Sequence, residues 1–107
     1  MANNYKNAKV DLTTTNATVL YTAPAATTVI VKSILVSEDS GNADTITLTI
    51  TDSSSAVFSL YNVKAVSANT TIELLTGPLV VQESEILKAT AATANRLHVV
   101  ASLLEVN

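Results

Sequence analysis

The sequence predicts an all-β fold, a single-domain antiparallel β-sandwich of about eight strands with a jelly-roll or immunoglobulin-like topology. Three observations support this prediction. β-Branched residues dominate, apolar side chains recur mostly at every second position, and turn signals come about every ten residues. The 107 residues suit one domain. We expect an N-terminal arm over residues 1–8 and the sandwich domain over residues 9–107.

Turn residues divide the chain into the expected strands. Pro24 interrupts the first half because its nitrogen cannot donate a hydrogen bond to a strand ladder. The stretch 38–44, EDSGNAD, has the side chains that turns prefer, and Gly77 and Pro78 form a further turn. The segments between these signals are the expected strands: 9–13, 18–22, 28–38, 43–51, 56–63, 69–75, 78–81, 85–91 and 95–106.

The longest expected strand, 28–38, is apolar on both faces. Regular alternation along TVIVKSILVSE gives two apolar sets, one of Val29, Val31 and Leu35 and the other of Ile30, Ile34 and Val36. A strand that is apolar on both faces lies either at the centre of a sandwich or against a neighbouring subunit.

The segment 43–51, ADTITLTIT, alternates apolar residues with threonines. We expect Ile46, Leu48 and Ile50 to face the core and the threonines to face outward. Threonine arrays can also order water in β-helical ice-binding proteins, but those proteins repeat the motif on successive coils, and here it occurs once. An outward strand face, stabilised modestly by cross-strand threonine pairs, is therefore the preferred interpretation.

Charge and cysteine content exclude several classes of function. Charged residues make up 14% of the chain, against roughly 25% in an ordinary soluble domain, so the surface is poorly protected against association. The six lysines and arginines are scattered and the net charge is −3, which disfavours nucleic acid and anionic membranes as partners. Without cysteine the chain has no disulfide and no thiolate chemistry.

The sequence shows neither a recognisable secretory signal nor a candidate membrane-spanning helix. Its first residues, MANNYKNAKVDL, lack the apolar segment of a secretory signal. No apolar run approaches the ~20 residues of a membrane-spanning helix. We therefore expect a protein that is made in the cytoplasm and is not exported by the usual route.

No pattern of catalytic or cofactor-binding residues is visible, so we expect neither an enzyme nor a cofactor. The single histidine, His98, has no G-x-S-x-G motif to accompany it, and two glycines cannot build a phosphate-binding loop. Three carboxylates, Glu38, Asp39 and Asp44, flank one turn and could suit calcium, but their spacing is not that of an EF-hand. A solvated hairpin turn is preferred. One Phe, three Tyr and no Trp argue against a sugar-binding platform.

The sequence resembles small structural proteins encoded by tailed bacteriophages. That group has a Thr-rich lead, then LYT-x-P-A, a turn and T-x-x-V-x-x-I-x-V, and the matching residues here are Leu20, Tyr21, Thr22, Pro24, Ala25, Thr28, Val31, Ile34 and Val36. The segment 43–50 resembles the partner strand of the group's hairpin, and 97–105 resembles its closing strand. The group commonly has Gly before Thr in the loop, where this chain has Ala26 before Thr27.

The resemblance implies a virion protein without enzymatic activity. Members of the group are capsid decoration (cement) proteins, head or tail fibres and other tail-associated subunits, and most are oligomeric. The leading expectation is a decoration protein that binds across major capsid subunits, as a trimer at three-fold positions. A tail or fibre subunit that assists host attachment is the alternative. The residues expected at interfaces are Asn3, Asn4, Tyr5, Ile30, Ile34, Val36, Thr45, Thr47 and Thr49.

Overall fold

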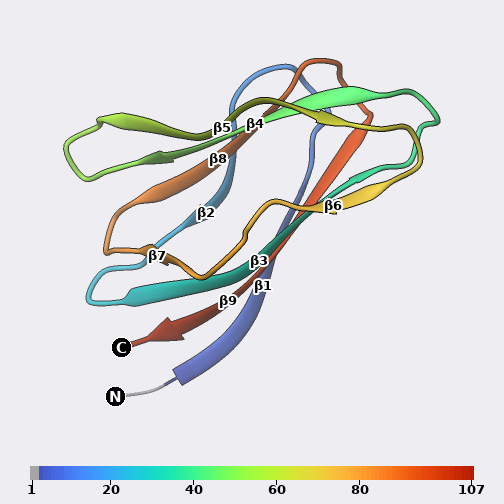
Figure 1. Cartoon of the computed structure of the whole chain (residues 1–107). Coiled ribbons are helices and arrows are strands. Elements are labelled where there is room, and N and C mark those ends of the chain that lie inside the picture. The colour runs from blue at the N-terminus through green and yellow to red at the C-terminus, as the bar shows by residue number, and fades with distance from the viewer. Residues whose placement is uncertain (1–2) are drawn as a thin grey trace.

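The computed structural model describes residues 3–107, which form two packed antiparallel sheets and contain no helix (Figure 1). One sheet consists of β1 (Asn3–Asp11), β3 (Thr28–Glu38), β6 (Thr71–Glu73), β7 (Leu79–Val81) and β9 (Leu97–Val106). The other consists of β2 (Thr18–Thr22), β4 (Asp44–Thr51), β5 (Val57–Val66) and β8 (Ile86–Ala91). The predicted all-β sandwich is confirmed, with nine strands.

The strand order distinguishes the two predicted topologies. The five-stranded sheet has the order β1-β9-β3-β6, with β7 pairing to β3, and the four-stranded sheet has the order β2-β8-β4-β5. Because β6 and β7 pair with opposite ends of β3, they act as one interrupted strand. Each sheet then has four positions, as in a jelly roll. An immunoglobulin-like sandwich keeps its first two strands in one sheet, whereas β1 and β2 lie in different sheets here.

The first strand begins earlier than the sequence predicts. Residues 3–8, which lie in the expected N-terminal arm, form the first part of β1 and pair with β9 in an unbroken register from Asn3 to Asp11. The remainder of the expected arm, residues 1 and 2, lies outside the described residues. This part of the chain is therefore held along a sheet edge.

Apolar side chains from both sheets fill the space between them. The largest fully buried apolar residues are Leu12, Val29, Val31, Ile34, Val36, Ile46, Leu48, Leu74, Leu87, Leu97 and Leu103. As predicted, Ile46 and Leu48 face inward, while Ile50 lies half-buried against this core. Small side chains such as Ala89 and Ala101 are also buried and allow the sheets to approach closely.

A β-bulge interrupts the alternation of β3. The register of β3 with β9 shifts between Val31 and Ser33, so Lys32 is an extra residue on β3. The inward-facing positions therefore change parity, and the buried apolar residues of the strand are Val29, Val31, Ile34 and Val36. The prediction that Ile30 shares a face with Ile34 is wrong, because regular alternation does not survive an inserted residue.

Two buried carboxylates organise the two ends of the sandwich. Glu38, at the end of β3, accepts hydrogen bonds from the Ser40 hydroxyl and from the backbone N–H groups of Ser40, Gly41 and Asn69. The Ser40 hydroxyl, followed by these N–H groups, lowers the pKa of Glu38 to about 2 although burial opposes the shift. The predicted turn at 38–44 is thus built around one anion.

At the other end, Glu105 of β9 accepts a hydrogen bond from the Tyr21 hydroxyl of β2 and pairs with Lys6 Nζ of β1 at 3.0 Å. The Tyr21 hydroxyl and, to a smaller extent, Lys6 lower the pKa of Glu105 in spite of its burial. Burial, followed by this carboxylate, raises the pKa of Tyr21. The Tyr21–Glu105 bond joins the two sheets, which fixes this end of the sandwich.

Candidate interaction surface

Apolar side chains form a line across the outer face of the five-stranded sheet. Leu104 of β9 lies directly opposite Tyr5 of β1 and Ile30 of β3, and Ile30 lies opposite Val80 of β7. Directly opposed residues of antiparallel strands project from the same face. Val100 and Leu35 form a further opposed pair on this face. We name six residues the apolar band: Tyr5, Ile30, Leu35, Val80, Val100 and Leu104.

The apolar band is open to solvent rather than covered by the chain. Tyr5 is 74% exposed, Val80 51% and Leu35 39%, while the other three are half-buried. Single exposed apolar residues are normal on a soluble protein, but their concentration on one face marks an interaction site. The band is therefore the first candidate for a protein-binding surface.

A hollow beside the band adds depth to this surface. Its volume is about 460 Å³, and it lies between the strand residues Ile30 and Leu104 and the loop 75–78. Lys32, the bulge residue, lines the same hollow and places its Nζ 5.5 Å from the centre of the Tyr5 ring. The bulge thus brings a cation over the aromatic face, an interaction worth about 0.5–1 kcal/mol at exposed sites.

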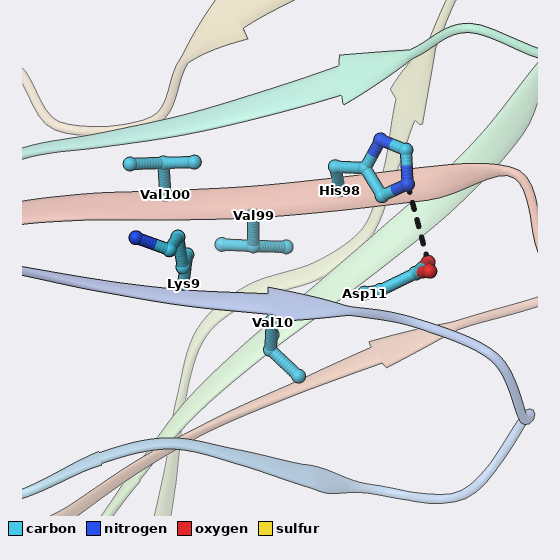
Figure 2. Close-up of a pocket in the computed structure, with 6 residues that line it drawn as sticks. All are labelled: Lys9, Val10, Asp11, His98, Val99 and Val100. Atoms are coloured by element: carbon cyan, nitrogen blue, oxygen red, sulfur yellow. Dashed lines mark ion pairs between the residues drawn. The ribbon is translucent and has the colours of Figure 1, made fainter.

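The far end of the same face is polar. The His98 ring lies between two carboxylates, with Nε2 3.2 Å from Asp11 and Nδ1 3.4 Å from Asp39. Figure 2 shows the His98–Asp11 contact beside Lys9 and Val100, which line a hollow of about 310 Å³ together with Val10 and Val99. Each ring nitrogen of His98 therefore has a carboxylate within 3.4 Å, which makes this end of the face polar.

The outer face of the four-stranded sheet has a different character, because it carries the threonines of β4. Thr45, Thr47 and Thr49 are each half-buried between the neighbouring strands. Thr47 lies opposite Thr90 of β8, and its hydroxyl accepts a hydrogen bond of 3.0 Å from the Val63 N–H. Part of the hydroxyl array is therefore used within the fold.

Exposed apolar residues also occur on β5, but they do not gather on one face. Val57 lies opposite Thr51, on the outward side, whereas the next residue, Phe58, lies opposite Ile50 on the inward side at the open end of the sandwich. Val63 stands where the β4–β5 register shifts and has a positive φ of 53°. These side chains point in different directions and form a weaker candidate than the apolar band.

The nine residues predicted at interfaces divide among three places. The β1 edge and the outer face of the five-stranded sheet hold Asn3, Asn4, Tyr5 and Ile30. The outer face of the four-stranded sheet holds Thr45, Thr47 and Thr49. The core holds Ile34 and Val36. Those two were placed at an interface wrongly, because both are fully buried within the chain and offer no surface to a partner.

Four residues of the apolar band were missed by sequence reasoning: Leu35, Val80, Val100 and Leu104. A signal was present in β9, where LHVVASLLEV is apolar at both odd and even positions. Because only one face of β9 lies in the core, apolar residues at the remaining positions indicate an apolar outer face. The outward position of Leu35 could not be predicted, because it depends on the β-bulge at Lys32.

The carboxylates around the 38–44 turn are directed to different partners. Glu38 accepts the loop N–H groups, Asp39 faces His98, and Asp44 Oδ2 accepts the Thr93 N–H at 3.1 Å. Within residues 3–107, no group of three or more His, Cys, Asp or Glu side chains is placed to hold a metal ion. The arrangement supports a structural role for this turn.

No protein-family model matches the chain, and no curated protein sequence matches it. Among residues 3–107, no helix long and apolar enough to cross a membrane is found. Functional inference therefore depends on the surfaces described above.

Proposed function

We propose that this chain is a non-catalytic structural subunit of a tailed-bacteriophage virion, and specifically a capsid decoration protein that binds across neighbouring major capsid subunits. The observation that carries the proposal is the apolar band on an outward sheet face. An outward face with exposed apolar side chains and a polar rim suits contact with another protein surface. The sequence resemblance to phage structural proteins supplies the identity of the partner.

The fold is compatible with this role but does not specify it. Jelly-roll sandwiches occur in viral capsid and lectin domains and in cupins, so fold similarity is an analogy only. Binding would depend on burial of the apolar band, with no bond made or broken. Each site needs only about 800 Å² per partner, because repeated contacts on a symmetric particle multiply a weak affinity.

The decisive test is the copy number of the chain in purified particles of its phage, measured by quantitative mass spectrometry against the major capsid protein. A simple ratio to the capsid protein, with hundreds of copies, supports decoration. A few dozen copies or fewer would favour the alternative, a tail or fibre subunit that assists host attachment. Absence from the particles would exclude both.

A binding experiment tests the surface itself. Particles that lack the chain are mixed with purified protein, and the bound fraction is measured after sedimentation. We expect Leu35→Ser combined with Val80→Ser to reduce binding at least tenfold, because both side chains belong to the apolar band. The control, Val57→Ser combined with Val63→Ser, removes two more exposed valines from β5 and should bind as wild type. Equal loss in both variants would contradict the assignment of the band.

A further inference from the structure

We propose that two copies of the chain join edge to edge through β1, in antiparallel orientation, so that their five-stranded sheets become one continuous sheet. The occupant of the free edge of β1 is therefore a second copy of the same strand. The inference goes beyond the virion role and does not depend on it, because it concerns the purified chain alone.

The β1 edge differs from the other sheet edges in the described part of the chain. β1 pairs with β9 over nine successive residues without a shift in register. In contrast, the register between β5 and β4 shifts twice, and the register between β2 and β8 shifts once. β6 and β7 have three residues each. Proteins protect sheet edges with bulges and short strands, and β1 has neither device.

The backbone of β1 presents its free donors and acceptors in a regular series. The Leu12 N–H donates to Leu97 O, and Leu12 O accepts from the Asn95 N–H, so the backbone at Leu12 faces β9. Hydrogen-bonding direction alternates along a strand, which turns the backbone of the odd-numbered residues toward the free edge. These residues are Asn3, Tyr5, Asn7, Lys9 and Asp11. The first four could each exchange both backbone hydrogen bonds with a second strand, whereas Asp11 O already accepts the Thr13 N–H at 3.0 Å and only the Asp11 N–H remains for the second strand.

Side-chain charge and strand overlap together favour one register for a two-fold pair. Registers centred on Lys6 or Lys9 would place two lysines opposite each other, which is unfavourable. The register centred on Asn7 opposes Tyr5 to Lys9 and Asp11 to Asn3, with no like charges in contact. It also uses the whole strand, whereas a register centred on Ala8 leaves the first residues of β1 beyond the end of the partner strand.

Lys6 does not obstruct this arrangement. Its side chain is directed between the sheets, where Nζ pairs with the buried Glu105 at 3.0 Å. In the Asn7-centred register, Lys6 directly opposes the small residue Ala8, and the second copy's Lys6 is its diagonal neighbour on the same face. An inward-facing lysine can protect an edge from pairing, but here its charge is matched within its own chain.

The two-fold pair has a consequence for the apolar band. Opposed residues keep the same face, so the outer faces of both copies point to the same side of the joined sheet. The two bands would then engage one partner surface together and increase avidity without a new contact. A two-fold strand pair closes at two copies, in contrast to the trimer that the resemblance implies.

Mass and cross-linking measurements test the pair. Sedimentation and light scattering of the wild-type chain should give twice the 11.2 kDa chain mass at tens of micromolar. Asn7→Pro should give a monomer with an unchanged circular dichroism spectrum, because proline is tolerated where an edge N–H faces solvent. Asn7→Cys should form a covalent dimer on mild oxidation, since opposed residues lie about 5.5 Å apart and a disulfide spans roughly 4.4–6.8 Å.

The chain has no native cysteine, so the cross-link is specific to the introduced residue. Ala65→Cys on the β5 edge is the control and should cross-link at least tenfold more slowly. A monomeric wild type, a trimer, or equal cross-linking at both positions would overturn the proposal. A dimer that persists in Asn7→Pro would also overturn it. If Asn7→Pro fails to fold, the comparison of the two cysteine variants decides.

Discussion

The outer faces of the two sheets differ in the side chains that they carry. Both sheets bury one face in a shared core, yet the five-stranded sheet carries the apolar band on its outer face while the four-stranded sheet carries half-buried threonines there. We name the outer face of the four-stranded sheet, with Thr45, Thr47 and Thr49 of β4, the threonine face. On this face, the Thr47 hydroxyl accepts a hydrogen bond from the bulged backbone of β5. On the apolar face, Tyr5 and Val80 are more than half exposed.

This difference indicates which outer face would gain more from burial against a partner. On the threonine face the Thr47 hydroxyl has a backbone partner, whereas Thr51 Oγ1 is buried without a hydrogen-bond partner among residues 3–107. Half-buried threonines gain little from further burial. An apolar face gains about 25 cal/mol for each Å² removed from water. The five-stranded sheet therefore gains more free energy from a partner on its outer face, and the following predictions test how sharply the two faces differ.

The largest expected effect separates the inner and outer faces of β3. Ile34→Ala should lower the free energy of unfolding by about 2–5 kcal/mol, because Ile34 is fully buried. Ile30→Ala should cost about 1 kcal/mol or less, because Ile30 lies on the outer face. Urea denaturation of the two variants measures both values. Similar losses would mean that the bulge at Lys32 does not separate the two residues.

This comparison also shows how far the fold could be predicted from sequence. Period-two patterns and turn residues located all nine strands, and 18–22 and 28–38 match the observed bounds of β2 and β3. The faces of β3 could not be predicted beyond Val31, because the extra residue Lys32 exchanges inside and outside. Nothing in the local composition marks a bulge at a lysine.

The candidate site was predictable only in part, for the same physical reason. Tyr5 and Ile30 were placed at an interface, and they do lie on the outer face of one sheet. Their common neighbour Leu104 was missed, because the pairing of β9 between β1 and β3 is a property of the topology. Strand order depends on contacts distant in sequence, which periodicity does not contain.

The second expected effect concerns the response of the sandwich to acid. The folded pKa of Glu38, about 2, lies below the ordinary value of 4.5, so the unfolded chain binds this proton more tightly. Its stabilisation is fully present above about pH 4.5 and is lost as the pH falls through about 2. Glu38→Gln should therefore be less stable at neutral pH and should show a flatter pH dependence between these values.

Glu73 provides a control for Glu38 on the apolar face. It lies opposite Leu35 and accepts hydrogen bonds from the Ser33 hydroxyl and from the Ile34 N–H at 2.7 Å. Burial raises its pKa, but these bonds outweigh burial and lower the pKa overall. Thermal melts from pH 2 to pH 7 should show a smaller change in acid response for Glu73→Gln than for Glu38→Gln. An equal change in the two variants would mean that Glu73, on the outer face, contributes as much to the acid response as Glu38 does.

A smaller effect is expected on the threonine face. Thr47→Val removes the hydroxyl that accepts the Val63 N–H, and we expect a loss of about 0.5–1.5 kcal/mol in unfolding free energy. Thr47→Ser keeps the acceptor and should retain most of that stability. Thr49→Val, on the same face, should change it by about 0.5 kcal/mol or less. If Thr47→Val and Thr49→Val behave alike, the bond to the β5 bulge contributes nothing measurable.

The smallest effect belongs to the polar end of the apolar face. A double-mutant cycle of His98→Gln and Asp11→Asn should give a coupling below about 1 kcal/mol, because an ion pair between exposed groups is screened by water. The coupling should decline in high salt, because dissolved ions screen the attraction between exposed charges. Asp39 flanks the same ring at 3.4 Å and retains part of the attraction when Asp11 is replaced. A coupling that is unchanged by salt would mean that the contact is a hydrogen bond rather than an ion pair, in which case this end of the face differs from the threonine face in geometry but not in charge.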